Sequence, residues 1–205
     1  MDRSSEKANV LTHGIGVLGA AMLVPLLIWR AATVGDAGDV VGVSVFGVSA
    51  ICLYLASTCY HAARRAQLKA RLKVLDHSAI FLLIAGSYTP FLLGALRGAW
   101  GWSLFGVIWG LAVAGVVFKF FFTGRFPLVS TAIYLGMGWL IVIAAVPMFR
   151  MMPGAALAWL AAGGIAYTAG TPFYHRSHSR YAHAVWHVFV LAGSLCHGIA
   201  IALQI

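Results

Sequence analysis

Long apolar runs, separated by short charged segments, repeat along the whole sequence of 205 residues. A helix needs about 20 consecutive apolar residues to cross the roughly 30 Å hydrocarbon core of a bilayer. Seven stretches meet this requirement: residues 10–29, 40–61, 75–96, 100–122, 128–149, 154–173 and 182–204. The pattern therefore predicts an all-α membrane protein, folded as a seven-transmembrane helix bundle.

The composition leaves little room for a soluble domain. Hydrophobic residues make up 61% of the chain and charged residues 9%, against about 45–50% and about 25% in ordinary soluble domains. No linker long enough to separate domains interrupts the apolar runs, so we expect a single seven-helix membrane domain over residues 1–205. The first run is longer than the core of a signal peptide, which has about 7–15 residues, and we interpret it as a span.

The net charge is +9, but the basic residues lie between the apolar runs and form no stripe interleaved with aromatic side chains. Nucleic acid is therefore not an expected partner. Anionic lipid headgroups are the natural partners of cations at span ends. The cysteines Cys52, Cys59 and Cys196 lie in apolar runs and form no CxxC pair, which argues against a disulfide framework or a thiolate zinc site.

Lys and Arg residues near the span ends predict the orientation, because such residues concentrate on the cytoplasmic side. One side of the predicted spans carries Arg3, Lys7, Arg64, Arg65, Lys69, Arg71, Lys73, Lys119, Arg125, Arg176 and Arg180. The other side carries only Arg30, Arg97 and Arg150. This distribution places the amino terminus in the cytoplasm and the carboxyl terminus outside.

Ionisable side chains within the spans are the first candidates for function, because each charged group costs about 2.5–3.5 kcal/mol to insert. Apart from Lys119 near a span end, Asp76 is the only charged residue in the seven predicted spans. The histidines in these spans are His13, His61, His77, His183, His187 and His197. Odd-numbered spans begin on the side where even-numbered spans end. We therefore expect Asp76 and these histidines, except His197, near the cytoplasmic face.

Two histidines four residues apart, His183 and His187, share one helix face and can reach a single metal ion. With His61 at the end of the second span, they would give zinc three protein ligands and one open position, as in catalytic zinc sites. Asp76 would then orient water in the open position and act as a general base. Ser57 lies one turn before His61 on the same face and would contact the site from a deeper layer.

Other roles fit the same residues. Asp76 lies near the start of its span, where the helix dipole favours a carboxylate as a simple cap. His183 and His187 would also serve as hydrogen-bonding groups between helices without any metal.

The remaining histidines have open roles. His175 is the main rival for the third ligand position, because Tyr-His pairs close both the second and the sixth span. His197 follows His187 by ten residues, or about 15 Å of helix, so it lies too deep for the same ion and is expected to bond between helices. His13 and His77 are candidates to support the ligands from outside.

Several short motifs occur together in one order: Ser57-Thr58-Cys59-Tyr60-His61, Asp76-His77-Ser78, Gly86-Ser87-Tyr88-Thr89-Pro90 and His183-Ala184-Val185-Trp186-His187. With the opening Asn9-Val10-Leu11-Thr12-His13-Gly14, they resemble the bacterial hemolysin III proteins, within the progestin and adipoQ receptor family. The resemblance extends over the whole chain. The combined SxxxH, Asp and HxxxH pattern is specific, although each piece alone is not.

The resemblance implies a seven-helix bundle with a cytoplasmic amino terminus in the bacterial plasma (inner) membrane. It also implies zinc held by His61, His183 and His187, with Asp76 near the zinc-bound water and Ser57 in the serine position of the motif. The third-ligand alternative, a histidine after the sixth span, has no counterpart in that motif.

Adiponectin receptors in this family are associated with ceramide hydrolysis, and related membrane families include alkaline ceramidases. The bacterial branch is named for a haemolytic activity. This chain has almost no amino-terminal cytoplasmic domain, so receptor signalling is not expected.

Three functions follow, in order of preference. The first is a zinc-dependent hydrolase of a membrane lipid amide or ester, with Asp76 moving protons and Ser57 close to the site. The second is a non-enzymatic lipid-sensing or membrane-homeostasis protein in which structural zinc joins helices. The third, a pore-forming cytolysin, is least favoured, because a channel needs polar groups along its whole length and here they gather at one face.

The orientation can be tested with the substitution Arg64→Cys in the predicted cytoplasmic segment 62–74, which carries five Lys or Arg residues. In intact cells, a membrane-impermeant thiol reagent should leave this position unlabelled, and permeabilised cells should label it. Labelling in intact cells would reverse the orientation and move the candidate site to the opposite face.

Overall fold

Seven long helical segments, packed side by side, make up the fold. The computed structural model describes residues 3–176 and 179–205. The elements are α1 (Arg3–Val34), α2 (Ala37–Ala62), α3 (Ala66–Leu93), α4 (Ala99–Phe122), α5 (Pro127–Trp139), the 3₁₀ helix η1 (Leu140–Ala144), α6 (Ala145–Met151), α7 (Gly154–His175) and α8 (Ala182–Gln204). Because α5, η1 and α6 follow one another without a loop, they count as one interrupted helix, and the predicted number of seven helices is confirmed.

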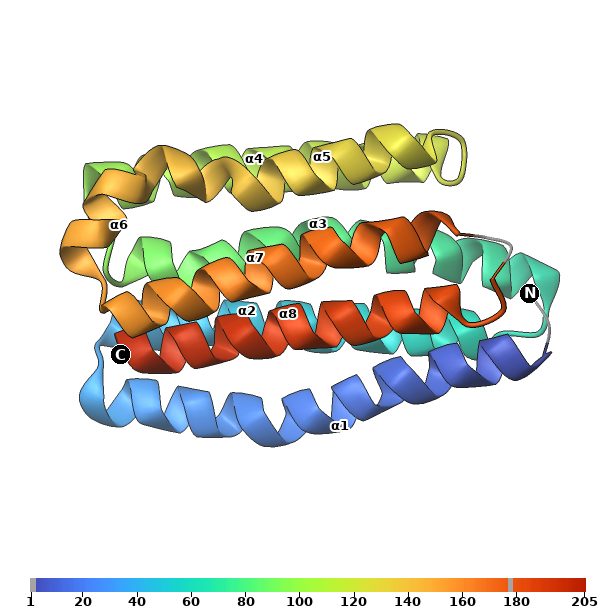
Figure 1. Ribbon diagram of the computed structural model, residues 1–205, viewed down its shortest axis with the longest axis horizontal. Helices are drawn as coiled ribbons and strands as arrows, with labels where there is room; N and C mark the ends of the chain where they lie inside the picture. Colours follow the sequence, from blue (N-terminus) through green and yellow to red (C-terminus); the bar gives the residue numbers. More distant parts are fainter. Residues whose placement is uncertain (1–2, 177–178) are drawn as a thin grey trace.

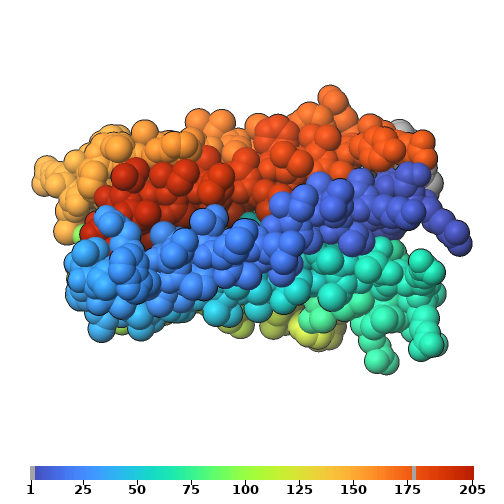
Figure 2. All heavy atoms as spheres, turned by 90° about the horizontal axis from the view of Figure 1, so that it is seen from below, coloured from blue at the N-terminus to red at the C-terminus, as the bar shows by residue number. Residues whose placement is uncertain are grey.

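The helices run roughly parallel to one long axis (Figure 1). In this view α4 and α5 form the upper edge, α3 and α7 lie below them, α2 and α8 follow, and α1 forms the lower edge. Figure 2 shows α1 lying across one face of the molecule, with α8 along its side. α1 packs mainly against α2 and α8, so the first helix of the chain packs against the last one.

The outer surface suits a lipid environment. In the part of the chain that the structure describes, five segments are long and apolar enough to cross a membrane: α1, α2, α4, the interrupted segment Pro127–Met151, and α8. Large apolar side chains such as Leu18, Phe121 and Phe149 are 66%, 72% and 75% exposed on the outside of these helices. The other two helices, α3 and α7, are less apolar, because α3 opens with several Lys and Arg residues and α7 is rich in Gly, Thr and Tyr.

The third predicted span, 75–96, has the wrong boundaries. The helix begins at Ala66, so most of the segment predicted as a loop over residues 62–74 forms the first turns of α3. Lys and Arg are good helix formers in water, and an apolar run marks only the part of a helix that lies in lipid. The helix ends at Leu93, because the chain turns at Gly94 and residues 94–98 connect to α4.

A side chain from α3 supports the break between α5 and α6. The Tyr88 hydroxyl lies 2.6 Å from the carbonyl oxygen of Met137 and 2.9 Å from that of Gly138. It also accepts a hydrogen bond from the N–H of Ile141 at 2.9 Å. A membrane helix tolerates such a break only where neighbouring groups satisfy the freed backbone. Tyr88 supplies both an acceptor and a donor at this point.

The turn between α1 and α2 is fixed by Asp36. Its carboxylate accepts hydrogen bonds from the N–H groups of Gly38 and Asp39, at 2.7 and 3.2 Å, and so caps α2. Arg97, in the turn between α3 and α4, donates to both oxygens of this carboxylate at 2.6 and 2.7 Å. The Arg97 guanidinium and the backbone donors hold the pKa of Asp36 well below its ordinary value. The ion pair joins two turns at one end of the bundle.

Glycine allows the start of α4 to approach the end of α3. A Cβ atom at Gly101 would collide with the carbonyl oxygen of Leu92 and lie 2.7 Å from that of Leu96. Backbone atoms cannot move aside as the tip of a flexible side chain can. The close contact of α3 and α4 therefore depends on this position.

We expect Gly101→Val to destabilise the protein by about 1–3 kcal/mol, the usual cost of overpacking. Gly110→Val is the matched control, because it lies in the same helix and a Cβ there would meet nothing within 4 Å. Thermal unfolding in detergent measures both variants. Equal unfolding midpoints for the two variants would show that the contact between α3 and α4 accommodates the added side chain without loss of stability.

Candidate metal centre

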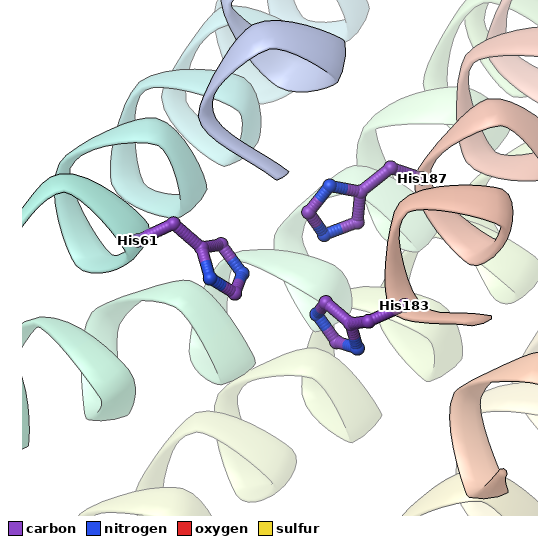
Figure 3. A group of neighbouring side chains, drawn as sticks. All are labelled: His61, His183 and His187. Carbon is purple, nitrogen blue, oxygen red and sulfur yellow. The ribbon is translucent and has the colours of Figure 1, made fainter. Parts of the chain in front are cut away.

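Three histidines from two helices converge at one end of the bundle (Figure 3). His61 lies in the last turn of α2, and His183 and His187 lie one turn apart at the start of α8. Their ring centroids are 4.6 to 5.2 Å apart. One nitrogen from each ring lies within 4.8 Å of the other two. Among residues 3–176 and 179–205, this is the one group of His, Cys, Asp or Glu side chains with the spacing to hold a metal ion.

The ring of His61 is oriented by Glu6 of α1. A carboxylate oxygen of Glu6 lies 2.7 Å from Nδ1 of His61, and the side-chain amide of Asn9 lies 3.3 Å from the same atom. A carboxylate accepts hydrogen bonds, so Nδ1 carries the proton and Nε2 keeps its lone pair. Nε2 of His61 is buried and has no hydrogen-bond partner. It is therefore free to bind a ligand inside the bundle.

His187 is oriented in the same way by Thr12. The Thr12 hydroxyl lies 3.0 Å from the carbonyl oxygens of Ala8 and Asn9, to which it donates its single hydrogen. The same oxygen lies 3.0 Å from Nδ1 of His187 and must act there as the acceptor. The lone pair of His187 is consequently on Nε2, as in His61.

His13 completes a row of side chains along one face of α1. Its ring stacks on that of His187 with centroids 3.6 Å apart and an interplanar angle of 12°. Glu6, Asn9, Thr12 and His13 are spaced three, three and one residues apart, which places them along one side of a helix. Glu6 also forms an ion pair with Lys69 of α3 at 2.9 Å. The first helix thus supports a site whose three histidines belong to α2 and α8.

Sequence reasoning did not assign roles to the first three members of this row. A signal existed, because Asn9, Thr12 and His13 are polar residues at helical spacing within or beside an otherwise apolar run. Polar residues close to a span end usually contact lipid headgroups. The sequence alone therefore did not indicate that these residues contact the candidate metal ligands.

The predicted proton-transfer residue, Asp76, is buried with 7% of its surface exposed. It lines the same cavity as His183 and His187 but is not one of the three grouped ligands. The predicted Ser57 is completely buried and lies next to the Asp76 carboxylate. The hydroxyl of Ser57 falls outside ordinary hydrogen-bond geometry. The two residues are therefore neighbours, at a contact that is looser than a regular hydrogen bond.

A large cavity begins at the histidines and extends through the bundle. Its volume is about 270 Å³. The polar end is lined by His13, Asp76, His77, His183 and His187. Apolar side chains of α3, α5, α6, α7 and α8 line the rest, as far as Met148, Phe149 and Leu157. This shape suits an amphiphile with its chain in the bundle and its polar group at the histidines.

The other predicted histidines lie apart from the group of three. Nε2 of His175 lies 3.0 Å from the Thr131 hydroxyl, between α7 and α5. His77 lines the cavity without joining the grouped ring nitrogens. His197 lies deeper in the bundle, where its ring meets the edge of Tyr167 at a centroid distance of 5.4 Å.

Similar proteins occur in bacteria and in mammals. The family model described as "Haemolysin-III related" matches residues 1–198. The chain is 49% identical over 189 residues to the hemolysin-3 homolog of Bacillus subtilis, covering 92% of this chain and 89% of that protein. It is 46% identical over 189 residues to hemolysin-3 of Bacillus cereus, covering 92% and 86%. The human monocyte to macrophage differentiation factor is 28% identical over 210 residues, covering 95% of this chain and 82% of that protein. The chain therefore belongs to the haemolysin-III-related family of multi-pass membrane proteins.

Proposed function

We propose that this protein is a zinc-dependent hydrolase of a lipid amide or ester, of the ceramidase type, in the bacterial plasma (inner) membrane. One observation carries the proposal: a buried carboxylate and two of the three grouped imidazoles line the polar end of a long apolar cavity, and the third imidazole, that of His61, lies beside them. A lipid with its acyl chain in this cavity would present its polar linkage to these groups. Membrane lipids are the substrates that such a bundle meets directly.

The three ring nitrogens suit zinc. Neutral imidazole is a common zinc ligand, with a bond of about 2.0–2.1 Å. The Nδ1 atoms of His61 and His187 are bonded to side chains of α1, as zinc-bound histidines usually are to their outer partners. Their Nε2 atoms, with one nitrogen of His183, would hold the ion. A bound zinc ion would polarise the carbonyl group of the lipid and make water more acidic.

Asp76 is assigned to proton transfer. In hydrolysis the bond between the acyl carbon and its nitrogen or oxygen breaks, and the hydroxyl of water joins the acyl carbon. The remaining proton of water must reach the leaving atom. A carboxylate oxygen of Asp76, which lines the cavity beside the histidines, would take this proton and deliver it. Ser57, packed next to Asp76, would position the carboxylate.

The rival proposal is a non-enzymatic role in lipid sensing or membrane homeostasis. It is favoured by the fact that the three imidazoles join α2 to α8. A metal ion at this place would fasten two helices together even without turnover. Both proposals require zinc, and they differ in the role of Asp76.

We expect the purified protein to carry about one zinc ion per chain, held by three imidazoles. His187→Ala should lose most of this zinc. His175→Ala should keep it, because the His175 ring is bonded to Thr131 outside the group. Elemental analysis of protein purified without added metal measures both variants. Full zinc content in His187→Ala would contradict the assignment.

Thr12→Val should weaken zinc binding about 10–100-fold, the usual effect of removing an outer partner of a metal ligand. The change keeps the shape of the side chain but removes the acceptor for Nδ1 of His187. Thr33→Val is the matched control in the same helix, because the Thr33 hydroxyl bonds only the carbonyls of Trp29 and Arg30. Competition with a zinc chelator gives both affinities. Equal values would show that Thr12 does not orient the ligand.

Asp76→Asn separates the enzyme from the structural site. If Asp76 transfers protons, this variant should keep most of its zinc and lose lipid hydrolysis by a factor of about 10²–10⁴. Mass spectrometry of ceramide, phospholipid and lysolipid substrates measures the loss. A structural site predicts the reverse, with lower zinc content or thermal stability in the variant and no turnover by the wild type.

A further inference from the structure

We infer that the cavity holds a second polar site, further along α8 than His187, which recognises a hydroxyl group on the acyl chain of the ligand. The site is formed by Tyr167 of α7 with Ser194 and His197 of α8. The inference rests on the proposed function for the position of the ligand's polar end, but it concerns a different part of the ligand.

The site lies well away from the three histidines. Tyr167 and His197 both line the cavity. His197 follows His187 by ten residues, so it lies about 15 Å further along α8. Leu157, Leu160 and Val190 also line the cavity. Polar side chains at this depth are costly in a membrane protein and commonly mark a functional site.

One atom of this site lacks a partner. Nδ1 of His197 is buried and makes no hydrogen bond, while the ring interacts with the backbone carbonyl of Leu160. A buried polar atom without a partner carries a cost comparable to a lost hydrogen bond. A ligand that bonds to Nδ1 would remove this cost, and an all-carbon chain would not.

The positions of both rings depend on glycine. A Cβ atom at Gly163 of α7 would collide with Cδ2 of His197 and lie 2.5 Å from its Nε2. A Cβ atom at Gly193 of α8 would lie 2.7 Å from Cε2 and Cζ of Tyr167. Each helix thus lacks a side chain where the ring of the other helix enters. The two rings are therefore seated in fitted spaces between α7 and α8.

The hydrogen-bonding groups match a hydroxyl. Tyr167 and Ser194 share a hydrogen bond of 2.8 Å in which either oxygen can be the donor. The Tyr54 hydroxyl lies next to Ser194. The two hydroxyl groups of Tyr167 and Ser194 have two hydrogens for this one bond, so one hydrogen remains available. A ligand hydroxyl, which donates and accepts, would bond this cluster and Nδ1 of His197. Sites that bond a hydroxyl discriminate strongly against the analogue that lacks it.

Binding of two fatty acids to the purified full-length protein in nanodiscs tests the inference. One ligand is octadecanoic acid, and the other is the same acid with a hydroxyl near the middle of its chain. The fluorescence of Trp139 and Trp186, which line the cavity, reports binding. The wild type should bind the hydroxylated acid about tenfold more tightly, the usual effect of one good hydrogen bond. Equal affinities in the wild type would overturn the inference.

His197→Phe keeps an aromatic ring against Gly163 and should remove the preference between the two acids. His175→Phe is the matched control, because His175 does not line the cavity, and it should retain the preference. If His197→Phe does not fold, Gly163→Ala gives a second route, since its Cβ would displace the His197 ring. A preference that survives loss or displacement of this ring would refute the site.

This binding assay does not depend on turnover. A preference for the hydroxylated acid without any hydrolysis would support the second site and contradict the proposed enzyme activity. Hydrolysis without the preference would support the proposed enzyme activity and refute the second site.

Discussion

The cost of an unpaired polar group in the interior of a membrane protein governs this fold. Water is absent there, so each backbone and side-chain polar group needs a partner within the protein. The helices satisfy most of the backbone internally. Where α5 ends and η1 begins, the Tyr88 hydroxyl donates a hydrogen bond to the carbonyl of Met137 and accepts one from the N–H of Ile141. The same requirement explains why the few polar side chains in the bundle are gathered and bonded to one another.

The candidate metal centre is the largest such gathering. Its three histidines come from α2 and α8, but α1 supplies the groups that orient them. Glu6 carries this arrangement further, because it bonds both His61 and Lys69. Four helices therefore meet at the site, and the outer partners fix which nitrogen of each bonded ring faces the interior. A site built this way depends on helix packing as much as on the ligands themselves.

The sequence allowed the number of helices to be predicted, because the bilayer fixes the length of an apolar run. The predicted ends of α3 were wrong, because hydropathy indicates the part of a helix that lies in lipid and not the full length of the helix. The grouping of His61, His183 and His187 could be expected from spacing and from the parity of the spans. The roles of Glu6 and Thr12 could not, because they depend on how α1 leans across α2 and α8.

The cavity and the break at η1 also lay beyond sequence reasoning. Neither Pro nor paired Gly residues mark the break within Leu140–Ala144, and its support comes from Tyr88 of another helix. The cavity depends on the positions of α5 and α7 relative to α3 and α8. A pattern of apolar residues along one helix carries no information about the distance to the next.

The contact between the first and the last helix has a consequence for biosynthesis. Thr12 and His187 are 175 positions apart, whereas Glu6 and His61 are separated by 55. During translation α1 enters the membrane first, and its row of polar side chains has no partners until the later helices have been made. Glu6 is paired with His61 once α2 has inserted, but Thr12 meets its partner only when α8 has inserted. A stalled or truncated chain would therefore expose this row to lipid, which gives the cell a physical difference between an unfinished protein and a complete one.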